Sequence, residues 1–246
     1  MFKIDIIVEA RMGSKRLPGK VLRLSNKKPM LYWMFKRLKL IKYVSNIIIA
    51  TTKLNVDNEI CDFANKNNIK YYRGSENNVL QRVINAANEN STDQIVEITG
   101  DDPLVDPFIV SEIIDSHIKN YSTNKISAND FYKQVPLGSN ARIFSFSLLK
   151  KINQLTKNNF HRENVESYFY QNYKKFNFNH THLNKNFKRN DIRLTMDTIE
   201  DFKVIDSILS YFLPKIDFTL KEIIQFLDLN PKIKNINSKI VQNEIR

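Results

Sequence analysis

The sequence is poor in cysteine, with a single one, Cys61, among its 246 residues. A lone cysteine excludes an internal disulfide and any zinc site built from several cysteines. Long apolar runs are also absent: the longest near the N-terminus, Ile4–Val8, is far too short to span a bilayer. The N-terminus lacks the cleavage-site pattern of a signal peptide as well. We therefore expect a cytoplasmic protein that does not insert into membranes.

Acidic residues are missing from one segment near the N-terminus. Between Arg11 and Val56 there are 12 Lys and Arg residues and no Asp or Glu, whereas the rest of the chain holds 26 basic and 26 acidic residues. The whole net charge of +12 therefore comes from this segment, which favours contact with a polyanionic ligand. The alternative is a solvated, Lys-rich helix surface, and we expect such a surface to include Lys36, Arg37, Lys39 and Lys42.

The charge is also compatible with a nucleic-acid-binding protein. Such a protein needs a basic stripe interleaved with exposed aromatic side chains. The nearby aromatic residues Tyr32, Trp33 and Phe35 instead fit a helix face and its neighbours. We therefore expect no nucleic-acid partner.

Apolar segments of strand length alternate with segments of helical periodicity, as is typical of a mostly parallel sheet flanked by helices. With 42% hydrophobic residues, the chain can form one globular domain over residues 1–230, of which about 125–190 form a less regular part. The tail, residues 231–246, has no clear pattern. The expected strands are Ile4–Val8, Ile47–Thr51, Ile69–Tyr72, Gln94–Thr99, Lys125–Asn129, Ala141–Phe146, Phe176–His182 and Arg193–Met196. The expected helices are Pro29–Ile41, Asp57–Asn67, Val79–Glu89, Pro107–Tyr121, Phe146–Ile152, Glu163–Tyr173, Ile199–Phe212 and Leu220–Leu227.

The most informative segment follows the first strand and reads Ala10-Arg-Met-Gly-Ser-Lys-Arg-Leu-Pro-Gly-Lys-Val-Leu22. It leaves the carboxyl end of that strand, where open α/β sheets bind ligands. Four cations and two glycines within ten residues are typical of a phosphate-binding loop. A Walker loop is excluded because five residues, not four, separate Gly13 from Gly19, and Val21 replaces the required Ser or Thr. The dinucleotide fingerprint is absent too.

Four motifs in one order resemble those of the cytidylyltransferases that activate acidic sugars, and within these the spore coat polysaccharide biosynthesis protein F family. The first is the loop above, which resembles A-R-M-G-S-x-R-L-P-G-K-V-L. The others are Arg73–Arg82, Thr99–Asp106 and Arg193–Phe202, which resemble R-G-S-E-x-D-V-L-x-R, T-G-D-x-P-L-I-D and R-L-T-V-D-T-P-E-D. Together they extend over roughly residues 4–202.

This resemblance implies a Rossmann-like α/β fold of the nucleotide-diphospho-sugar transferase type, with a small β/α arm on the acceptor side or at a dimer interface. It also implies a homodimer and an Mg²⁺-dependent enzyme that binds CTP. By resemblance, the triphosphate lies against the loop, whose binding residues are Ala10, Arg11, Gly13, Ser14, Arg16 and Lys20. Arg73, Ser75 and Arg82 belong by resemblance to the base and ribose pocket, although Ser75 alone is equally compatible with a helix cap.

Two aspartates are candidate metal ligands. Asp101 follows the strand that ends at Thr99, and Asp197 follows the expected strand Arg193–Met196. Carboxylates at the carboxyl ends of neighbouring strands suit Mg²⁺, which binds a few carboxylates together with phosphate oxygens and water. The alternatives are a turn or N-cap role for Asp101 and a helix start at Asp197. Asp102 and Asp106 are expected as turn and N-cap residues, with Asp102 also a possible neighbour of the metal.

The expected reaction is attack of an acceptor oxygen on the α-phosphate of CTP, with release of pyrophosphate, for the synthesis of a surface polysaccharide or glycoconjugate. Arg11, Lys20 and Asp101 are the candidate catalytic residues, because fixed cations offset the charge that develops on pyrophosphate. The acceptor is expected to be an anionic small molecule, an acidic sugar or a phosphorylated compound, released as its CMP or CDP derivative. The main alternative is a glycosyltransferase that consumes a nucleotide sugar, although the sequence Asp101-Asp102-Pro103 does not supply the D-x-D metal motif.

Three positions depart from the family pattern. Glu9 occupies the position where glutamine is common, Asn78 replaces an aspartate, and Ile199 replaces a proline. The first departure matters most, because it places a carboxylate beside the phosphate-binding loop.

Overall fold

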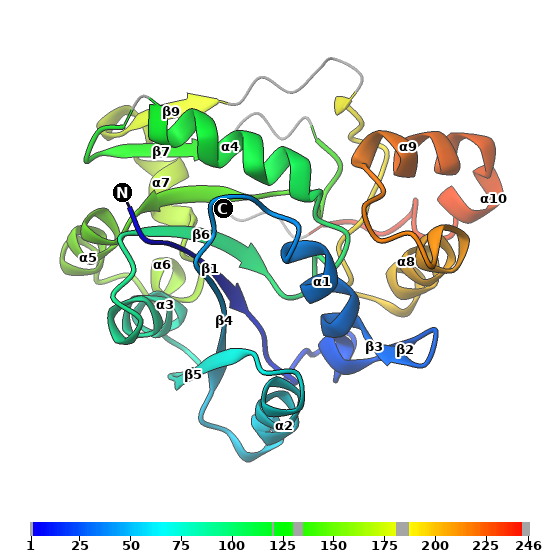
Figure 1. Ribbon diagram of the computed structural model, residues 1–246, viewed down its shortest axis with the longest axis horizontal. Helices are drawn as coiled ribbons and strands as arrows, with labels where there is room; N and C mark the ends of the chain where they lie inside the picture. The colour runs from blue at the N-terminus through cyan, green and yellow to red at the C-terminus, as the bar shows by residue number, and fades with distance from the viewer. Residues whose placement is uncertain (1, 120, 130–134, 181–186, 243–246) are drawn as a thin grey trace.

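A seven-stranded sheet runs through the molecule, with helices on both of its faces (Figure 1). The computed structural model describes residues 2–119, 121–129, 135–180 and 187–242. The strands are β1 (Ile4–Glu9), β2 (Leu24–Ser25), β3 (Lys28–Pro29), β4 (Asn46–Thr52), β5 (Lys70–Gly74), β6 (Gln94–Thr99), β7 (Lys125–Ala128), β8 (Arg142–Ser145) and β9 (Asn177–His180). The α-helices are α1 (Met30–Leu38), α2 (Asn58–Lys66), α3 (Val79–Glu89), α4 (Pro107–Lys119), α5 (Phe146–Leu155), α6 (Asn159–Glu163), α7 (Ser167–Gln171), α8 (Ile199–Phe212), α9 (Leu220–Leu229) and α10 (Pro231–Lys234). Short 3₁₀ helices are η1 (Lys20–Leu22), η2 (Asn55–Asp57) and η3 (Tyr173–Lys175).

The main sheet has the strand order β5-β4-β1-β6-β8-β7-β9. Strands β5, β4, β1 and β6 are mutually parallel, and β7 pairs with β9 in parallel. β8 runs antiparallel to both of its neighbours, β6 and β7. This confirms the expected mostly parallel sheet and its Rossmann-like class. Because β1 and β6 are adjacent and parallel, the loops after them leave the same edge of the sheet.

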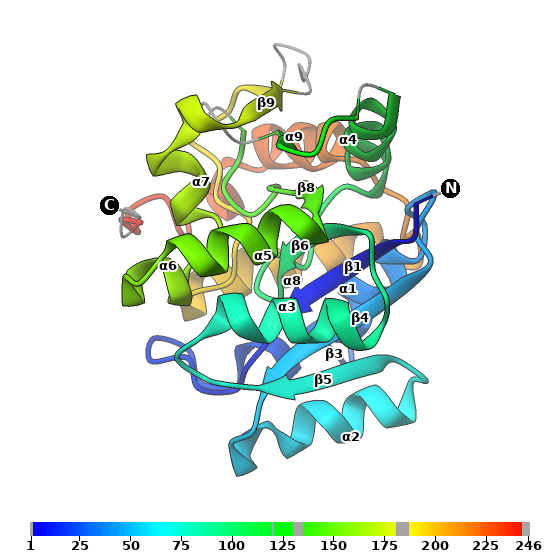
Figure 2. The same ribbon diagram turned by 90° about the vertical axis from the view of Figure 1, so that its left-hand side faces the viewer.

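Two apolar layers hold the sheet between its helices. On one face the buried residues come mainly from α1, α4, α8 and α9, and on the other from α3, α5 and α7. Figure 2 shows α3 and α5 on the side facing the viewer, with α1, α8 and α9 beyond the sheet. Strand β1 alternates between the two layers: Ile6 and Val8 pack into the first, and Ile7 into the second. Burial on both faces explains why the central strands are so apolar.

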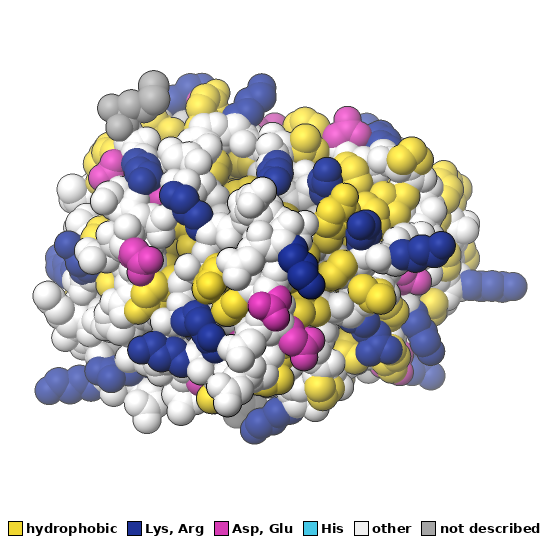
Figure 3. Space-filling model, turned by 60° about the horizontal axis from the view of Figure 1, so that its bottom comes forward, with side chains coloured by type: hydrophobic (Ala, Val, Ile, Leu, Met, Phe, Trp, Pro, Cys, Tyr) yellow, Lys and Arg dark blue, Asp and Glu magenta, His cyan; other side chains and the backbone are white. Residues whose placement is uncertain are grey.

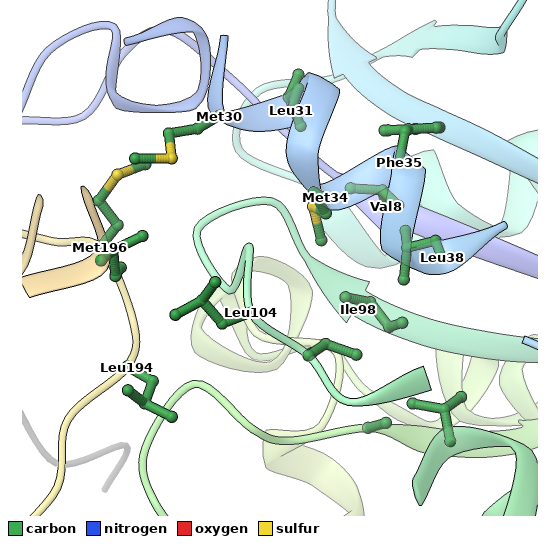
Figure 4. Close-up of a cluster of buried hydrophobic side chains, with 14 of the residues drawn as sticks. Val8, Met30, Leu31, Met34, Phe35, Leu38, Ile98, Leu104, Leu194 and Met196 are labelled. Atoms are coloured by element: carbon green, nitrogen blue, oxygen red, sulfur yellow. The ribbon is translucent and has the colours of Figure 1, made fainter. Parts of the chain in front are cut away.

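The expected strand Arg193–Met196 is wrong. Apart from one isolated bridge between Leu137 and Arg193, the segment pairs with no strand of the sheet within the described residues. It is nevertheless buried, with Leu194 and Met196 fully inaccessible. Figure 4 shows these two side chains beside Leu104 and Met30 in the first apolar layer. Burial of the whole segment therefore arises here from packing at the edge of the core rather than from a sheet ladder, and an apolar pattern alone cannot separate the two.

Other expectations differ in detail. The expected helix Glu163–Tyr173 is instead divided among α6, α7 and η3, and the hairpin β2–β3 was not expected. The tail contains α10, and Asn237 in it is buried with its amide donating to Asp201. Residues 181 and 182 of the expected strand Phe176–His182 lie outside the described ranges. Within those ranges, no helix is both long and apolar enough to cross a membrane.

Arg37 was expected on a solvated surface, and that expectation is wrong. Its side chain is buried, and its guanidinium group lies 3.9 Å from the ring centre of Phe218. The same group donates hydrogen bonds to the backbone carbonyls of Ile216 (2.6 Å) and Phe218 (2.9 Å). Carbonyl acceptors and an aromatic face together compensate for desolvation of the charge. Part of the N-terminal basic excess is therefore structural.

Candidate active site

A cavity of about 630 Å³ lies at the edge of the sheet where β1 and β6 end. Its walls come from segments that are far apart in the sequence: the loop after β1, the start of α3, the turn after β6, the end of α6, and the residue before Thr198. Of the site residues expected from the sequence, most line this cavity: Ala10, Arg11, Gly13, Ser14, Arg16, Lys20, Arg82, Asp101 and Asp197.

The loop after β1 is held in a fixed shape by its own backbone. The carbonyl of Met12 accepts hydrogen bonds from the amides of Ser14 (2.9 Å) and Gly19 (3.0 Å). Gly19 has a φ of 68°, in the left-handed region that favours glycine. The amide of Met12 in turn donates to the carboxylate of Asp57 (2.7 Å). The loop is therefore closed on itself and anchored to the segment before α2, while its cations extend into the cavity.

Gly100 allows the turn after β6 to pack closely against the end of β1 at the floor of the cavity. A Cβ atom at this position would lie 2.8 Å from the carbonyl oxygen of Glu9 and 3.0 Å from the Cβ of Ala10. The Gly100 amide donates to that same carbonyl (2.8 Å). Because no side chain fits there, the turn after β6 lies directly against the end of β1, which brings Asp101 next to the phosphate-binding loop.

Lys20 joins the two candidate metal ligands. Its Nζ lies 2.5 Å from Oδ2 of Asp101 and 2.9 Å from Oδ1 of Asp197. Burial by itself would lower the pKa of Lys20, but the charges of the two aspartates outweigh it and raise this pKa. Burial would likewise raise the pKa of Asp197, and the neighbouring cations, Lys20 first, lower it instead. Lys20 and Asp197 therefore stabilise each other's charged forms.

Asp197 is directed into the cavity because other residues cap the helix behind it. Thr198 and Asp201 form the capping box of α8. Arg193 donates to both carboxyl oxygens of the buried Asp201 (2.8 and 3.1 Å) and to Oδ2 of Asp197 (3.0 Å). Arg16 reaches the same oxygen at 2.8 Å from the cavity side. Thr198 and Asp201, not Asp197, therefore cap the helix. The Asp197 carboxylate remains available to bind cations in the cavity.

The two aspartates fit Mg²⁺. Among the described residues, no group of three or more His, Cys, Asp or Glu side chains is placed to hold a metal by itself. Mg²⁺ is commonly bound by one or two carboxylates and completes its shell with water and phosphate oxygens. The Lys20 ammonium group shows that Asp101 and Asp197 can share one positive charge. The donor set therefore suits a magnesium ion that enters together with a triphosphate.

A carboxyl pair that the sequence did not predict also lies at the cavity. Glu9 lines the cavity, and Glu97 lies behind it, two residues before Thr99 on the neighbouring strand. Burial raises the pKa of Glu9 to about 7, and burial together with Glu9 raises that of Glu97 well above its usual value. Arg82, from α3, is buried beside the pair and donates to the carbonyl of Ser75 (2.6 Å). The sequence indicated Glu9 through its departure from glutamine, but it gave no signal for Glu97.

Two residues assigned to the base and ribose pocket by resemblance do not line the cavity. Arg73 donates to the carbonyls of Thr52 and Leu54 (both 2.9 Å), so it supports the turn between β4 and α2. The hydroxyl of Ser75 accepts from the amide of Asn78 (3.1 Å), and Asn78, not Ser75, is the N-cap of α3. Ser75 therefore supports the start of α3, which lines the cavity, whereas Arg73 supports a turn outside it.

Other side chains considered from the sequence have structural roles. The carboxylate of Asp106 accepts from the amides of Phe108 (2.9 Å) and Leu220 (2.6 Å), so it caps α4 and also holds the start of α9. Asp102 is buried and accepts from the Thr99 hydroxyl (2.6 Å); burial, followed by the charge of Asp101, raises its pKa to about 7. His161 is buried against Ser167 and does not line the cavity.

The basic residues do not form a stripe for a nucleic acid on the face drawn in Figure 3. There the Lys and Arg side chains are spread singly over the surface, with Asp and Glu among them. Phe35 is buried in the core, and Trp33 is partly buried, with its ring nitrogen donating to the carbonyl of Ser25 (2.9 Å). These rings are therefore unavailable for stacking on bases.

Comparisons with known proteins agree with this geometry. The family model described as Cytidylyltransferase matches residues 6–236. The chain is 38% identical over 244 residues to an uncharacterized protein of Methanocaldococcus jannaschii, covering 99% of this chain and 98% of the relative. It is 28% identical over 236 residues to the spore coat polysaccharide biosynthesis protein SpsF of Bacillus subtilis, covering 94% and 96%.

A solved structure resembles the whole chain. It is a cytidylyltransferase from Leptospira borgpetersenii, with a TM-score of 0.90 and 33% sequence identity over 99% of this chain and 100% of that one. The family model and this structure both extend over the cavity and the sheet that carries it. The chain therefore belongs to the cytidylyltransferase family.

Proposed function

We propose that this protein transfers a cytidylyl group from CTP to an anionic small molecule, with release of pyrophosphate. The observation that carries the proposal is the cavity in which the cations of the loop after β1 face the Asp101–Asp197 pair. The product is the CMP or CDP derivative of an acidic sugar or a phosphorylated acceptor. The name of the Bacillus relative supports a role in the synthesis of a surface polysaccharide or glycoconjugate.

The loop cations bind the triphosphate in this reaction. Arg11 and Arg16 are about half exposed at the rim, where they can follow the phosphates, and Lys20 is nearly buried at the floor. As the bond between the α- and β-phosphates breaks, negative charge grows on the departing pyrophosphate. Fixed cations therefore stabilise the transition state more than they stabilise bound CTP. The hydroxyl of Ser14 accepts from the amide of Leu17 (3.3 Å), which leaves its O–H free to donate to a phosphate.

Asp101 and Asp197 would hold Mg²⁺. When bound, this ion neutralises phosphate charge and makes the α-phosphorus more electrophilic. With the ion on the two carboxylates, Lys20 would be available to contact the phosphates, while Arg193 holds Asp197 in place. The anionic acceptor enters beside Asp101 and needs little activation, so the protein contributes mainly by positioning the acceptor and by neutralising charge.

Binding of nucleoside triphosphates tests the proposal. CTP with Mg²⁺ should raise the melting temperature more than ATP, GTP or UTP, because a ligand that binds only the folded state stabilises it. The effect should weaken in Lys20→Ala and in Asp101→Asn. Acidic sugars and sugar phosphates are then screened for CTP-dependent release of pyrophosphate. Stabilisation by a nucleoside diphosphate sugar, with no response to any triphosphate, would instead support a glycosyltransferase.

A further inference from the structure

The floor of the cavity contains a carboxyl pair for which the proposed chemistry has no use. Glu9 is the last residue of β1, and Glu97 lies on β6 in the adjacent strand. Their side chains are within hydrogen-bond reach of each other, and Arg142 on β8 lies 3.6 Å from Glu97. The metal-binding carboxylates are Asp101 and Asp197, so this second pair is separate from them.

Three of the four oxygens of this pair are buried with no donor, in the described part of the chain, other than a proton shared between the two carboxyl groups. Oε1 of Glu9 and both carboxyl oxygens of Glu97 are buried, and among the described residues none of them accepts a hydrogen bond from any other backbone or side-chain donor. A buried acceptor without a donor is costly and rare in native proteins. Glu97 is behind the floor, whereas Glu9 lines the cavity, so a ligand can reach Glu9 alone. Oε2 of Glu9 is not among these buried oxygens, so a hydrogen-bond donor on the ligand can reach the carboxyl group there.

The charge of this part of the cavity limits what can bind there. Glu163 from α6 lines the same cavity, so carboxyl groups come from both the floor and the wall. Arg82 also lines the cavity and balances part of this negative charge, so this part of the cavity suits an uncharged, hydrogen-bonding group better than a phosphate. The nucleoside part of a nucleotide has no charge, but it carries an amino group on cytosine and two hydroxyls on ribose, all of which can donate to a carboxyl oxygen.

The position of Glu9 also fits a nucleoside. Glu9 lies opposite Thr99 in the register of β1 and β6, and Asp101 comes two residues later. The turn that contains Asp101 folds against the end of β1, where the Gly100 amide donates to the carbonyl of Glu9 (2.8 Å). A group bonded to Glu9 is thus within reach of a phosphate held by Lys20 and Asp101. We propose that Glu9, supported by Glu97, selects the nucleotide by accepting hydrogen bonds from the amino or hydroxyl groups of its nucleoside.

This inference rests on the proposed function, and calorimetry tests it without an acceptor. CTP, UTP, 2′-deoxy-CTP and 3′-deoxy-CTP are titrated with Mg²⁺ into the wild type, Glu9→Met and Glu9→Gln. UTP tests the amino group, and the two deoxy compounds test the hydroxyls. Glu76→Gln is the matched control, because Glu76 lines the same cavity, is paired with Arg11 rather than with Glu97, and its change removes the same charge.

The wild type should bind at least one analogue about ten- to a hundredfold more weakly than CTP, the effect of one hydrogen bond to a charged group. In Glu9→Met that ratio should fall close to one, because the variant has no acceptor oxygen. In Glu9→Gln it should be intermediate, and in Glu76→Gln unchanged. If Glu9→Met does not fold, the Glu9→Gln ratio decides alone.

The outcomes separate this inference from the proposed function. If the wild type binds no CTP, the proposed function fails. If CTP binds and every ratio is the same in the wild type and the Glu9 variants, the nucleoside does not contact Glu9 and the inference is overturned. Equal binding of all four nucleotides by the wild type would overturn it as well.

Discussion

Replacing Lys20 with methionine removes the ammonium group that lies between Asp101 and Asp197. In the ligand-free protein this group makes contacts of 2.5 and 2.9 Å, and 12% of its side chain is exposed. A divalent cation shared by the same carboxylates must displace it. The variant should therefore be less stable than the wild type, yet it should bind a divalent cation more tightly in the absence of nucleotide.

The size of both effects follows from the two contacts. Breaking a fully buried ion pair costs about 3–5 kcal/mol. Here the carboxylates are 24% and 11% exposed, and Arg16 and Arg193 still face Asp197, so we expect a loss of about 2–3 kcal/mol. For a domain of this size that lowers the melting temperature by roughly 5–10 °C. In the wild type a divalent cation must break these same contacts to bind, and in the variant it need not. The affinity of the variant for the cation should therefore rise about thirtyfold or more.

Thermal unfolding and calorimetric titration with MnCl₂ measure the two effects. Lys15→Met is the control, since Lys15 is an exposed cation of the same loop, and it should change neither quantity by much. CTP binding should weaken in Lys20→Met, which separates metal affinity from nucleotide affinity. A folded Lys20→Met with the Mn²⁺ affinity of the wild type would refute the reasoning, because the cation would then not bind between these carboxylates.

Three further predictions concern stability. The pKa of Glu9 is about 7 in the folded protein and 4.5 in the unfolded chain, so the folded protein loses stability as the pH rises from 4.5 to 7. Glu9→Gln should therefore stabilise the protein by up to about 3 kcal/mol above pH 7, and by progressively less toward pH 4.5. Urea unfolding at a series of pH values measures this difference. Gly100→Ala should destabilise by about 1–3 kcal/mol because its Cβ would lie 2.8 Å from a carbonyl oxygen, whereas Gly13→Ala meets an ordinary 3.7 Å contact; equal melting temperatures for the two would contradict this. Arg193→Met leaves the buried Asp201 without its ion pair and should lower the free energy of unfolding, measured with a chemical denaturant, by about 3–5 kcal/mol. Arg189→Met, at a more exposed ion pair, should lower it by about 1 kcal/mol or less. Similar losses in the two variants would show that burial is not the cause.

The sequence by itself determined the class of fold and indicated where the candidate site lies. Short apolar segments alternating with helical ones predicted the mostly parallel sheet, because strands buried on both faces are mostly apolar. The loop after β1 was identifiable because its cations and glycines are contiguous. Local signals also predicted the N-cap at Asp106, which the structure confirms.

Tertiary structure decided what depends on residues far apart in the sequence. Arg193–Met196 has the burial of a strand but no strand partner, and Arg37 is buried because carbonyls from residues 216 and 218 surround it. Lys20 meets Asp197 across 177 positions of sequence. Glu9 and Glu97 form a pair because β1 and β6 are neighbours in register. Each of these contacts depends on how the strands are ordered in the sheet and how the loops pack at its edge, and no local pattern in the chain records that arrangement.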